Sequence, residues 1–202
     1  MIEIKDIVKG YEQKVIFDHW SEKIQDGEFV IINGESGKGK TTLLNIIGSL
    51  EKVESGEVLV DGKNIFRRKN QREYLKDRVG FLFQNFALME SKTVEQNMKL
   101  VKPGIRSDFT LEECLDFVGV LELKKQKVYM LSGGEQQRVA LARLLFKKCD
   151  IILADEPTGS LDKKNAQKVM TLLKKLNEMG KTIIMVTHDE TYKNYGTRRI
   201  EL

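Results

Sequence analysis

The segment of the chain best suited to chemistry is a glycine-rich stretch between an apolar run and a helix-forming run. Residues 29–33 read FVIIN, and residues 34–41 read GESGKGKT, which is the pattern G-x-x-x-x-G-K-T. Its three glycines let backbone N–H groups turn inward around an anion, and the positive end of the following helix points at the same place. The Lys40 ammonium can bind phosphate oxygens there, and the Thr41 hydroxyl can bind Mg²⁺. The segment therefore predicts a nucleotide-phosphate site.

We expect the nucleotide to contact the whole of this loop and the first residues of the helix. Lys38 adds a second cation beside Lys40. The residues predicted to contact the phosphates are Gly34, Glu35, Ser36, Gly37, Lys38, Gly39, Lys40, Thr41 and Thr42.

Two adjacent carboxylates can complete this site from elsewhere in the chain. Residues 151–154 are four apolar residues that predict a buried strand, and Asp155 and Glu156 follow directly. Ligands of open α/β sheets bind at the carboxyl ends of the strands, so both carboxylates would face the phosphates. Asp155 can hold Mg²⁺, usually through water, and Glu156 can orient a water molecule against the γ-phosphate, as phosphoryl transfer requires.

A second anion site is predicted at residues 131–143, LSGGEQQRVALAR. Ser132 and Glu135 form an S-x-x-E capping box at the start of a helix. Gly133 and Gly134 expose backbone N–H groups in the first turn, where each glycine costs about 1 kcal/mol. Capping does not explain two glycines there, whereas a bound phosphate does.

This stretch resembles the signature motif of ATP-binding cassette (ABC) ATPases. The resemblance implies the ABC-ATPase form of the P-loop NTPase fold, with ATP and Mg²⁺ as cofactors and ATP hydrolysis as the reaction. In the family, the signature binds the γ-phosphate of the nucleotide held by the other subunit. The resemblance therefore implies a head-to-tail dimer of this chain, with two ATP molecules at the interface.

The remaining family elements follow in the expected order. Tyr11 matches the aromatic residue that stacks on adenine, Gln84 matches the Q-loop glutamine, and Asp162 in residues 160–162 matches the D-loop. His188 matches the switch histidine, whose neutral imidazole can hydrogen-bond the γ-phosphate and fix the attacking water. The resemblance assigns catalysis to Glu156, His188 and Gln84. It assigns Mg²⁺ binding to Thr41, Gln84 and Asp155. Beyond the loop, the residues it assigns to nucleotide binding are Tyr11, Ser132, Gly133, Gly134, Glu135 and Asp162.

The branch of the family is suggested by two further stretches. Residues 154–162, ADEPTGSLD, resemble the lipoprotein-releasing and macrolide-efflux ATPases, and residues 83–97 resemble ATPases of bacteriocin export or antimicrobial-peptide resistance. These resemblances imply a separately encoded integral membrane permease as partner, and export of a peptide, lipoprotein or drug-like substrate. The apolar residues Phe86, Leu88 and Met89 are predicted to contact that permease.

The elements that must position these residues alternate along the chain. Runs rich in β-branched residues alternate with helical stretches, which predicts an α/β fold with a mostly parallel sheet. We predict strands at Ile2–Val8, Glu28–Asn33, Val79–Phe83, Asp150–Ala154 and Thr182–Val186, and helices at 40–48, 111–118, 133–147 and 163–179. A single domain over 1–202 is expected, with a core at about 1–84 and 150–202 and a helical signature subdomain at about 85–149. The resemblance adds an antiparallel β part at the N-terminus.

Composition excludes several other classes. The chain has 202 residues with 41% hydrophobic residues, and its strongest apolar runs last four residues, where a membrane span needs about 18. Glu3, Lys5 and Asp6 stand where a signal peptide needs an apolar core. Cys114 and Cys149 belong to no C-x-x-C pair and have no histidine nearby, so neither a disulfide framework nor a zinc site is supported. We expect a cytoplasmic protein, peripheral on the inner face of the membrane through its permease.

Two other functions remain open. The first is a non-transport ABC ATPase that acts through a membrane partner in cell-wall or division control. The second is a soluble ABC ATPase on DNA or ribosomes, which is disfavoured because only about 90 residues separate the phosphate loop from the signature and because the chain has one cassette. The net charge of +4 is also weaker than the clustered charge of a nucleic-acid binder, and the basic residues between Arg67 and Arg78 are interpreted as a solvated helical face. No nucleic acid is expected as a partner.

Overall fold

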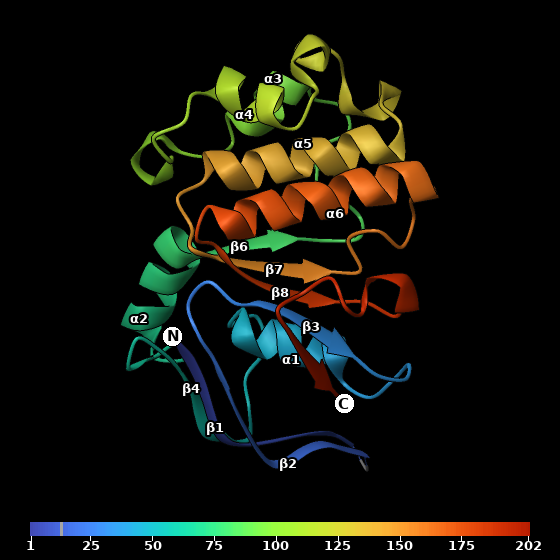
Figure 1. The fold of residues 1–202 in the computed structure, drawn as a ribbon. Helices are drawn as coiled ribbons and strands as arrows, with labels where there is room; N and C mark the ends of the chain where they lie inside the picture. The colour runs from blue at the N-terminus through green and yellow to red at the C-terminus, as the bar shows by residue number, and fades with distance from the viewer. Residues whose placement is uncertain (13) are drawn as a thin grey trace.

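A parallel sheet of five strands forms the centre of the molecule. The computed structural model describes residues 1–12 and 14–202 and is shown in Figure 1. The strands lie in the order β6-β7-β8-β3-β9, and every pairing between neighbours is parallel. Their bounds are β3 Phe29–Asn33, β6 Val79–Leu82, β7 Ile151–Asp155, β8 Thr182–Val186 and β9 Arg198–Glu201. The predicted parallel core is confirmed.

A second, antiparallel sheet is built mainly from the first part of the chain. Its strands are β1 Ile2–Tyr11, β2 Lys14–Ile24, β4 Ser55–Val60 and β5 Lys63–Asn64, in the order β2-β1-β4-β5. Strands β1 and β2 form a hairpin in which Tyr11 pairs with Lys14. The antiparallel β part expected at the N-terminus is therefore present.

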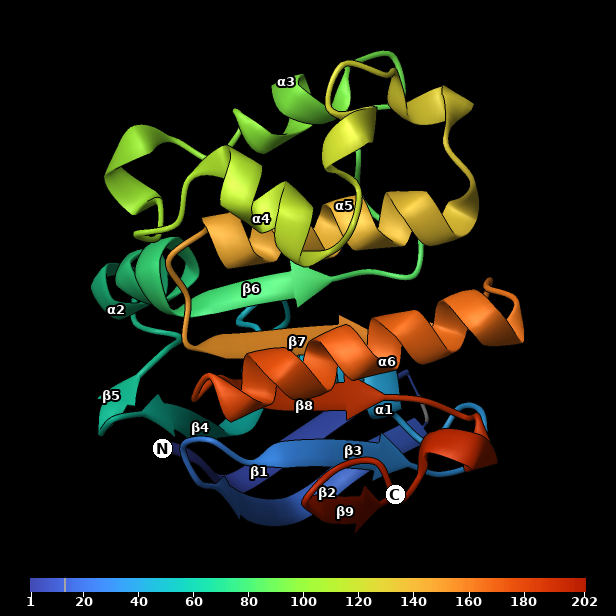
Figure 2. The same cartoon turned by 45° about the horizontal axis from the view of Figure 1, so that its top comes forward.

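Helices cover the parallel sheet on one face, and α1 with the antiparallel sheet covers the other. Figure 1 shows α5 and α6 side by side next to β6, β7 and β8, and Figure 2 shows β1 and β2 beyond β3. Residues of one strand alternate between two hydrophobic clusters: Phe29 and Ile31 face the helical cluster, whereas Val30 and Ile32 face the cluster shared with α1. This alternation is the period-2 geometry of a strand buried on both faces.

The longer helices follow the predictions closely. They are α1 Lys40–Ile47, α5 Gly133–Phe146 and α6 Lys163–Glu178. The shorter ones are α2 Arg68–Glu73, continued by a π-helical turn at Tyr74–Arg78, then α3 Val94–Met98 and α4 Leu111–Phe117. Short 3₁₀ turns lie at Pro103–Ile105, Leu121–Leu123, Val128–Met130 and Glu190–Tyr192.

The segment between β6 and β7 contains α3, α4 and α5 and joins them with turns. Helices α3 and α4 begin with capping boxes, Thr93 with Gln96 and Thr110 with Glu113, so the box predicted at Thr110 is confirmed. The division into a core and a helical subdomain at 85–149 stays a prediction.

None of the helices within residues 1–12 and 14–202 is both long enough and apolar enough to span a membrane. Cys114 and Cys149 are free thiols inside the core.

The sheet order brings distant segments to one edge. Strands β6, β7, β8 and β3 are neighbours and run in the same direction, so their carboxyl ends meet at the same edge (Figure 2). The phosphate loop follows β3, Asp155 ends β7, Gln84 follows β6, and His188 follows β8. The fold therefore collects residues from four strand ends at one place.

Candidate active site

The loop between β3 and α1 has the backbone that its glycines predict. Gly34, Gly37 and Gly39 have φ values of 149°, 78° and 94°, a region that side chains disfavour. A Cβ on Gly39 would also lie 2.3 Å from Cγ2 of Ile16 on β2, so only glycine fits there. The loop conformation thus depends on these residue types.

Lys40 opens α1 and turns its side chain back into the loop. Its Nζ donates to the carbonyl oxygens of Gly34 and Glu35, both at 2.8 Å. An ammonium group has three N–H donors, so two internal bonds leave one donor for a phosphate oxygen. The side chain is buried, so its charge acts in a less screened environment than a surface lysine.

A cavity of about 370 Å³ lies over this loop. Its size is within the range of small-molecule sites. The residues that line it are Tyr11, Ile16, Ser36, Gly37, Gly39, Lys40, Thr41, Thr42, Glu156 and Val186. Of the predicted nucleotide contacts, Tyr11 and six residues between Ser36 and Thr42 therefore line one space with Glu156, the predicted base, whereas Gly34, Glu35 and Lys38 are outside its lining. The loop's N–H groups and the Lys40 donor suit a polyphosphate.

The predicted metal ligands Thr41 and Asp155 lie together. The Thr41 hydroxyl donates to Oδ1 of Asp155 at 3.3 Å. Burial raises the pKa of Asp155, and the neighbouring Glu156 carboxylate raises it further. Within the described ranges, no group of three or more His, Cys, Asp or Glu side chains could hold a metal ion. A hydroxyl and one carboxylate suit Mg²⁺, which takes its remaining ligands from phosphates and water.

Glu156 projects from a strained turn directly after β7. Its φ is +45°, which costs an L-residue about 1–2 kcal/mol, and its backbone N–H donates to the Val186 carbonyl at 3.0 Å. The side chain is 16% exposed and lines the cavity, and its Oε1 lies 2.8 Å from Nδ1 of His188. The strained backbone thus holds a carboxylate facing the space where phosphates would bind.

His188 lies at the rim of the site. Its side chain is 72% exposed, and its backbone N–H also lies near the Glu156 carboxylate, at 3.4 Å from Oε2. With Nδ1 occupied by Glu156, the Nε2 side of the ring remains for another partner. A carboxylate and an imidazole in this arrangement can orient a water molecule and accept its proton.

Tyr11 also lines the cavity, and its ring is held in place by neighbouring side chains. Its hydroxyl donates to the Glu51 carboxylate, which also binds Nζ of Lys9 at 2.9 Å. Burial and the bond to Glu51 raise the pKa of Tyr11. Lys9 lies 4.7 Å from the ring centroid on one face. These contacts orient an aromatic surface that suits the stacking of a planar base.

Lys14 is a residue of this region that the sequence reasoning missed. Its Nζ donates to the carbonyl oxygen of Gly37 at 2.9 Å. The available signal was the position of Lys14 just after Tyr11, in a hairpin whose register pairs the two residues. That register depends on bulges that the sequence pattern does not reveal.

Gln84 lies at the same sheet edge but outside the cavity lining of the described residues. Its Nε2 is 3.3 Å from the position that a Cβ on Gly159 would occupy, so its amide lies against the segment after Glu156. The predicted metal-ligand role of Gln84 has no direct contact here to support it.

The loop after Gln84 is held by the signature helix. Phe86 and Ala87 both have left-handed backbones, with φ values of 61° and 47°. Their carbonyl oxygens accept bonds from the Arg143 guanidinium at 3.3 and 2.8 Å. A cation on α5 therefore fixes two consecutive strained residues.

The signature residues cap α5 as predicted. Ser132 Oγ donates to Oε2 of Glu135 at 2.7 Å, and the Ser132 N–H donates to the same oxygen at 2.8 Å. Hydrogen bonds from Ser132 lower the pKa of Glu135. These residues do not line the cavity of their own chain within the described structure.

A bound phosphate was predicted as the reason for both signature glycines, and for Gly134 this prediction is corrected by the packing of the chain. A Cβ on Gly134 would lie 2.4 Å from Cγ of Asn165, so packing within the chain requires glycine there without any bound phosphate. A Cβ on Gly133 would meet its nearest atom, in Leu161, at 3.6 Å, an ordinary contact. Only Gly133 remains without an internal reason to be glycine.

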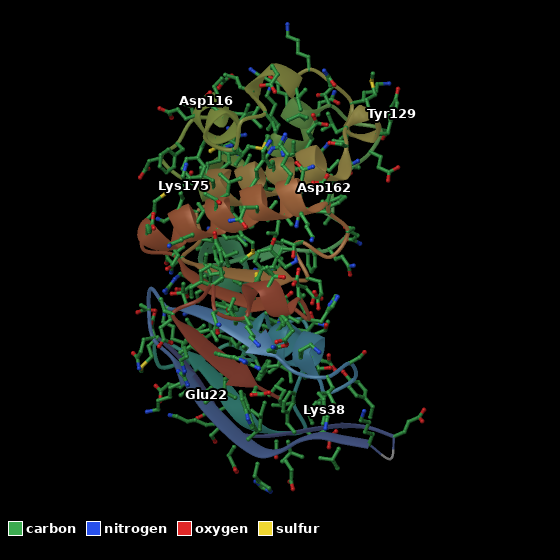
Figure 3. All side chains as sticks on the ribbon, turned by 45° about the vertical axis from the view of Figure 1, so that its right-hand side comes forward. Glu22, Lys38, Asp116, Tyr129, Asp162 and Lys175 are labelled. Atoms are coloured by element: carbon green, nitrogen blue, oxygen red, sulfur yellow. The ribbon has the colours of Figure 1, made fainter. Side chains whose placement is uncertain are left out.

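Asp162 caps α6 and is linked to the signature helix through Asn165. Its Oδ1 accepts from the Asn165 N–H at 2.9 Å, and its Oδ2 accepts from the Asn165 amide at 2.7 Å. Asn165 Oδ1 in turn accepts from Arg138 on α5 at 3.1 Å. Figure 3 shows Lys38, Asp162 and Tyr129 along the same side of the molecule, from the phosphate loop up to the segment before the signature.

Comparisons with known proteins agree with this geometry. The family model described as ABC transporter matches residues 17–159. The ABC transporter ATP-binding protein MJ0796 of Methanocaldococcus jannaschii is 40% identical over 218 residues, covering 100% of this chain and 93% of that protein. The macrolide export ATP-binding/permease protein MacB of Campylobacter jejuni is 39% identical over 211 residues, covering 100% of this chain and 33% of MacB. The chain therefore spans about a third of that relative's length.

A solved structure has the same fold. The dimeric structure of a post-hydrolysis state of the MJ0796 cassette bound to ADP and Pi superposes with a TM-score of 0.85 at 39% sequence identity. The match covers 100% of this chain and 94% of that one.

Proposed function

The chain belongs to the ABC transporter family, and from this premise we propose that it is the subunit whose ATP-driven dimerisation powers a separate membrane permease. The family predicted from the sequence is thereby confirmed, as are ATP hydrolysis and the cofactors ATP and Mg²⁺. The single observation that carries the proposal further is that Glu156 lines the same cavity as Lys40 and Thr41 and is paired there with His188. The finer roles below are our proposals.

We propose that Glu156 is the general base and that His188 orients it and the γ-phosphate. Asp155 and Thr41 would hold Mg²⁺, and Lys40 with the loop N–H groups would bind the phosphates. The bound ion neutralises charge on the transferred phosphoryl group. Gln84, two residues beyond the end of β6, would reach the site by a movement of its loop.

We propose that the second anion site acts on the nucleotide of a second copy of this chain. Two observations support this: Ser132 and Gly133 lie away from their own cavity, and the similar MJ0796 structure is dimeric. A head-to-tail pairing would place Ser132, Gly133 and Asp162 of each copy over the other copy's phosphate loop. Each active site would then need both copies.

We propose that the permease docks where the loop after Gln84 meets the segment before the signature. The Tyr129 N–H donates to the Glu90 carbonyl at 3.2 Å, which places these segments side by side. Met89, Tyr129 and Met130 are 46%, 61% and 63% exposed there, an apolar patch that suits a protein partner. Of the three residues predicted to contact the permease, Phe86 and Leu88 pack partly against the core, and Met89 is open.

We propose a location on the inner face of the cell membrane, reached through that permease, and export as the direction of transport. The name of the MacB relative, a macrolide export ATP-binding/permease protein, supports both. The proposed substrate class is a peptide, lipoprotein or drug-like molecule, with bacteriocin export as the specific candidate.

The docking proposal can be tested by membrane fractionation. Tagged wild-type chain expressed in its own host should sediment with membranes and purify in detergent with one polytopic membrane protein. Met130→Asp should move to the supernatant while keeping its basal ATPase rate, and Met179→Asp, at an exposed methionine after α6, should remain bound. Equal distribution of all three proteins between membrane and supernatant would refute the proposed surface.

A further inference from the structure

Gln137 is a fully buried glutamine on α5 whose amide is only half satisfied. Its Nε2 donates to the carbonyl oxygen of Pro157 at 2.7 Å. Its Oε1 is buried and has no hydrogen-bond partner in residues 1–12 and 14–202. A buried acceptor without a hydrogen-bond partner lowers the stability of the fold. A methionine at position 137 would fill about the same volume and would not bury such an acceptor. The bond to Pro157 is therefore the feature that only the glutamine provides.

That bond holds the turn that carries Glu156. Proline has no N–H, so its carbonyl is the only backbone group through which Pro157 can be held by a hydrogen bond. Glu156 itself is strained, with φ of +45°, and its carbonyl accepts from the Gly159 N–H at 3.1 Å. A left-handed non-glycine residue persists only where its surroundings hold it. Gln137 supplies such a contact directly after Glu156.

The same helix carries the signature. Gly133 and Gln137 are four residues apart, so they lie one turn from each other on α5. Figure 1 shows that α5 and α6 begin at the end of the sheet where β7 ends. The link from Arg138 through Asn165 to Asp162, and the close fit of Gly134 against Asn165, attach this turn of α5 to the start of α6.

We propose that Gln137 is a positioning residue for hydrolysis, which fixes the Glu156 turn and ties it to the signature helix of the same chain. When a partner's nucleotide engages the signature of one copy, the Gln137–Pro157 bond would transmit any movement of α5 to that copy's own Glu156. This inference rests on the proposed role of Glu156 and of the dimer.

The first test is the variant Gln137→Met, which keeps the side-chain volume and removes the donor. Because the bond orients the base and contacts no nucleotide, kcat should fall about tenfold to a hundredfold while the KM and Kd for ATP stay within about twofold. The matched control is Gln71→Met, at a residue outside the site. It removes a hydrogen bond from the Gln71 side-chain amide to the Ser49 carbonyl oxygen at 3.0 Å. Its kcat should equal the wild-type value.

Comparison of the kcat values of Gln137→Met and Gln71→Met distinguishes positioning of Glu156 from a general effect of removing a side-chain amide. An unchanged kcat in folded Gln137→Met, or a loss of kcat equal to that of Gln71→Met, would overturn the proposal. If Gln137→Met does not fold, Gln137→Asn keeps the amide but withdraws it by one methylene, and the same kcat loss is expected. If the wild-type chain itself hydrolysed no ATP, the proposed function would fail first.

Mixed dimers test the direction of the coupling. A dimer of Gln137→Met with Glu156→Gln has one Glu156, located in the Gln137→Met copy. A dimer of wild type with the double variant Gln137→Met/Glu156→Gln has one Glu156, located in the wild-type copy. Positioning within one chain predicts a lower rate for the first dimer than for wild type paired with Glu156→Gln, and no loss for the second. Loss only in the second would contradict the proposal.

Discussion

Nζ of Lys14 lies 2.9 Å from the carbonyl oxygen of Gly37, so a lysine on β2 is tied to the phosphate loop. We expect the Lys14 ammonium to add positive charge beside the bound phosphates. We expect Lys14→Ala to weaken ATP binding about two- to fivefold, the range of exposed charge pairs. Titration of ATP at low and high salt would check this, with a larger effect at low salt. Lys23→Ala, on the same strand but paired with Glu3, should leave the affinity unchanged; equal affinity of both variants would refute the role of Lys14.

Glu156→Gln should slow hydrolysis about 10²- to 10⁴-fold, the contribution of a general base. The amide keeps the size of the side chain but accepts no proton. ATP binding should be preserved, and light scattering should show a dimer that persists with ATP. Hydrolysis at the normal rate would remove Glu156 from the role of base.

Lys40→Ala should abolish measurable nucleotide binding. The substitution removes both the internal bonds to Gly34 and Glu35 and the cation offered to the phosphates. Calorimetric titration with ATP measures the loss, and a thermal melt with retained cooperativity shows that the protein is folded. Wild-type affinity in a folded Lys40→Ala variant would be incompatible with the phosphate-site assignment.

Ser132→Arg should leave ATP binding by the monomer intact and block ATP-induced dimerisation, because the new side chain fills the second anion site. Loss of the cap alone costs about 1 kcal/mol. Thr110→Arg is the matched control, since it removes an equivalent capping box from α4. In a Glu156→Gln background, Thr110→Arg should still give the dimer; a dimer in the Ser132→Arg variant as well would sink the composite-site proposal.

Gly134→Ala should destabilise the protein by about 1–3 kcal/mol, the usual penalty for overpacking. The new Cβ would lie 2.4 Å from Cγ of Asn165. Gly133→Ala makes only ordinary contacts, the nearest to Leu161 at 3.6 Å, and gains helix propensity, so its stability should equal or exceed that of wild type. Urea unfolding of the two variants gives the comparison, and equal midpoints would show that Asn165 moves aside without cost.

The sequence predicts those parts of the fold whose own residues carry a clear pattern, such as a continuous apolar run or a glycine-rich loop. Strands β3, β7 and β8 are continuous apolar runs because both faces of the sheet are covered, and the loop after β3 carries its glycine pattern with it. Strand β2 was missed because it is largely exposed and its pairing with β1 is interrupted by bulges, with left-handed residues at Asp6 and His19.

The parts of the site that sequence could not predict depend on contacts between distant segments. Gly134 is explained by Asn165, which lies on another helix, and no local pattern links them. The same holds for Gln137 and Pro157, and for Lys14 and Gly37. Motif recognition identified the groups that face the cavity, whereas the residues that hold them became visible only through tertiary packing.

The alternation of β3 between two hydrophobic clusters has a thermodynamic consequence. Phe29 and Ile31 belong to the cluster beneath α5 and α6, while Val30 and Ile32 belong to the cluster beneath α1. Unfolding of the helices that cover either cluster would expose one apolar face of β3 to water, which is unfavourable. The phosphate loop directly follows β3, and β3 is part of both hydrophobic clusters. We therefore expect the loop to keep its structure until both clusters unfold together in one cooperative transition.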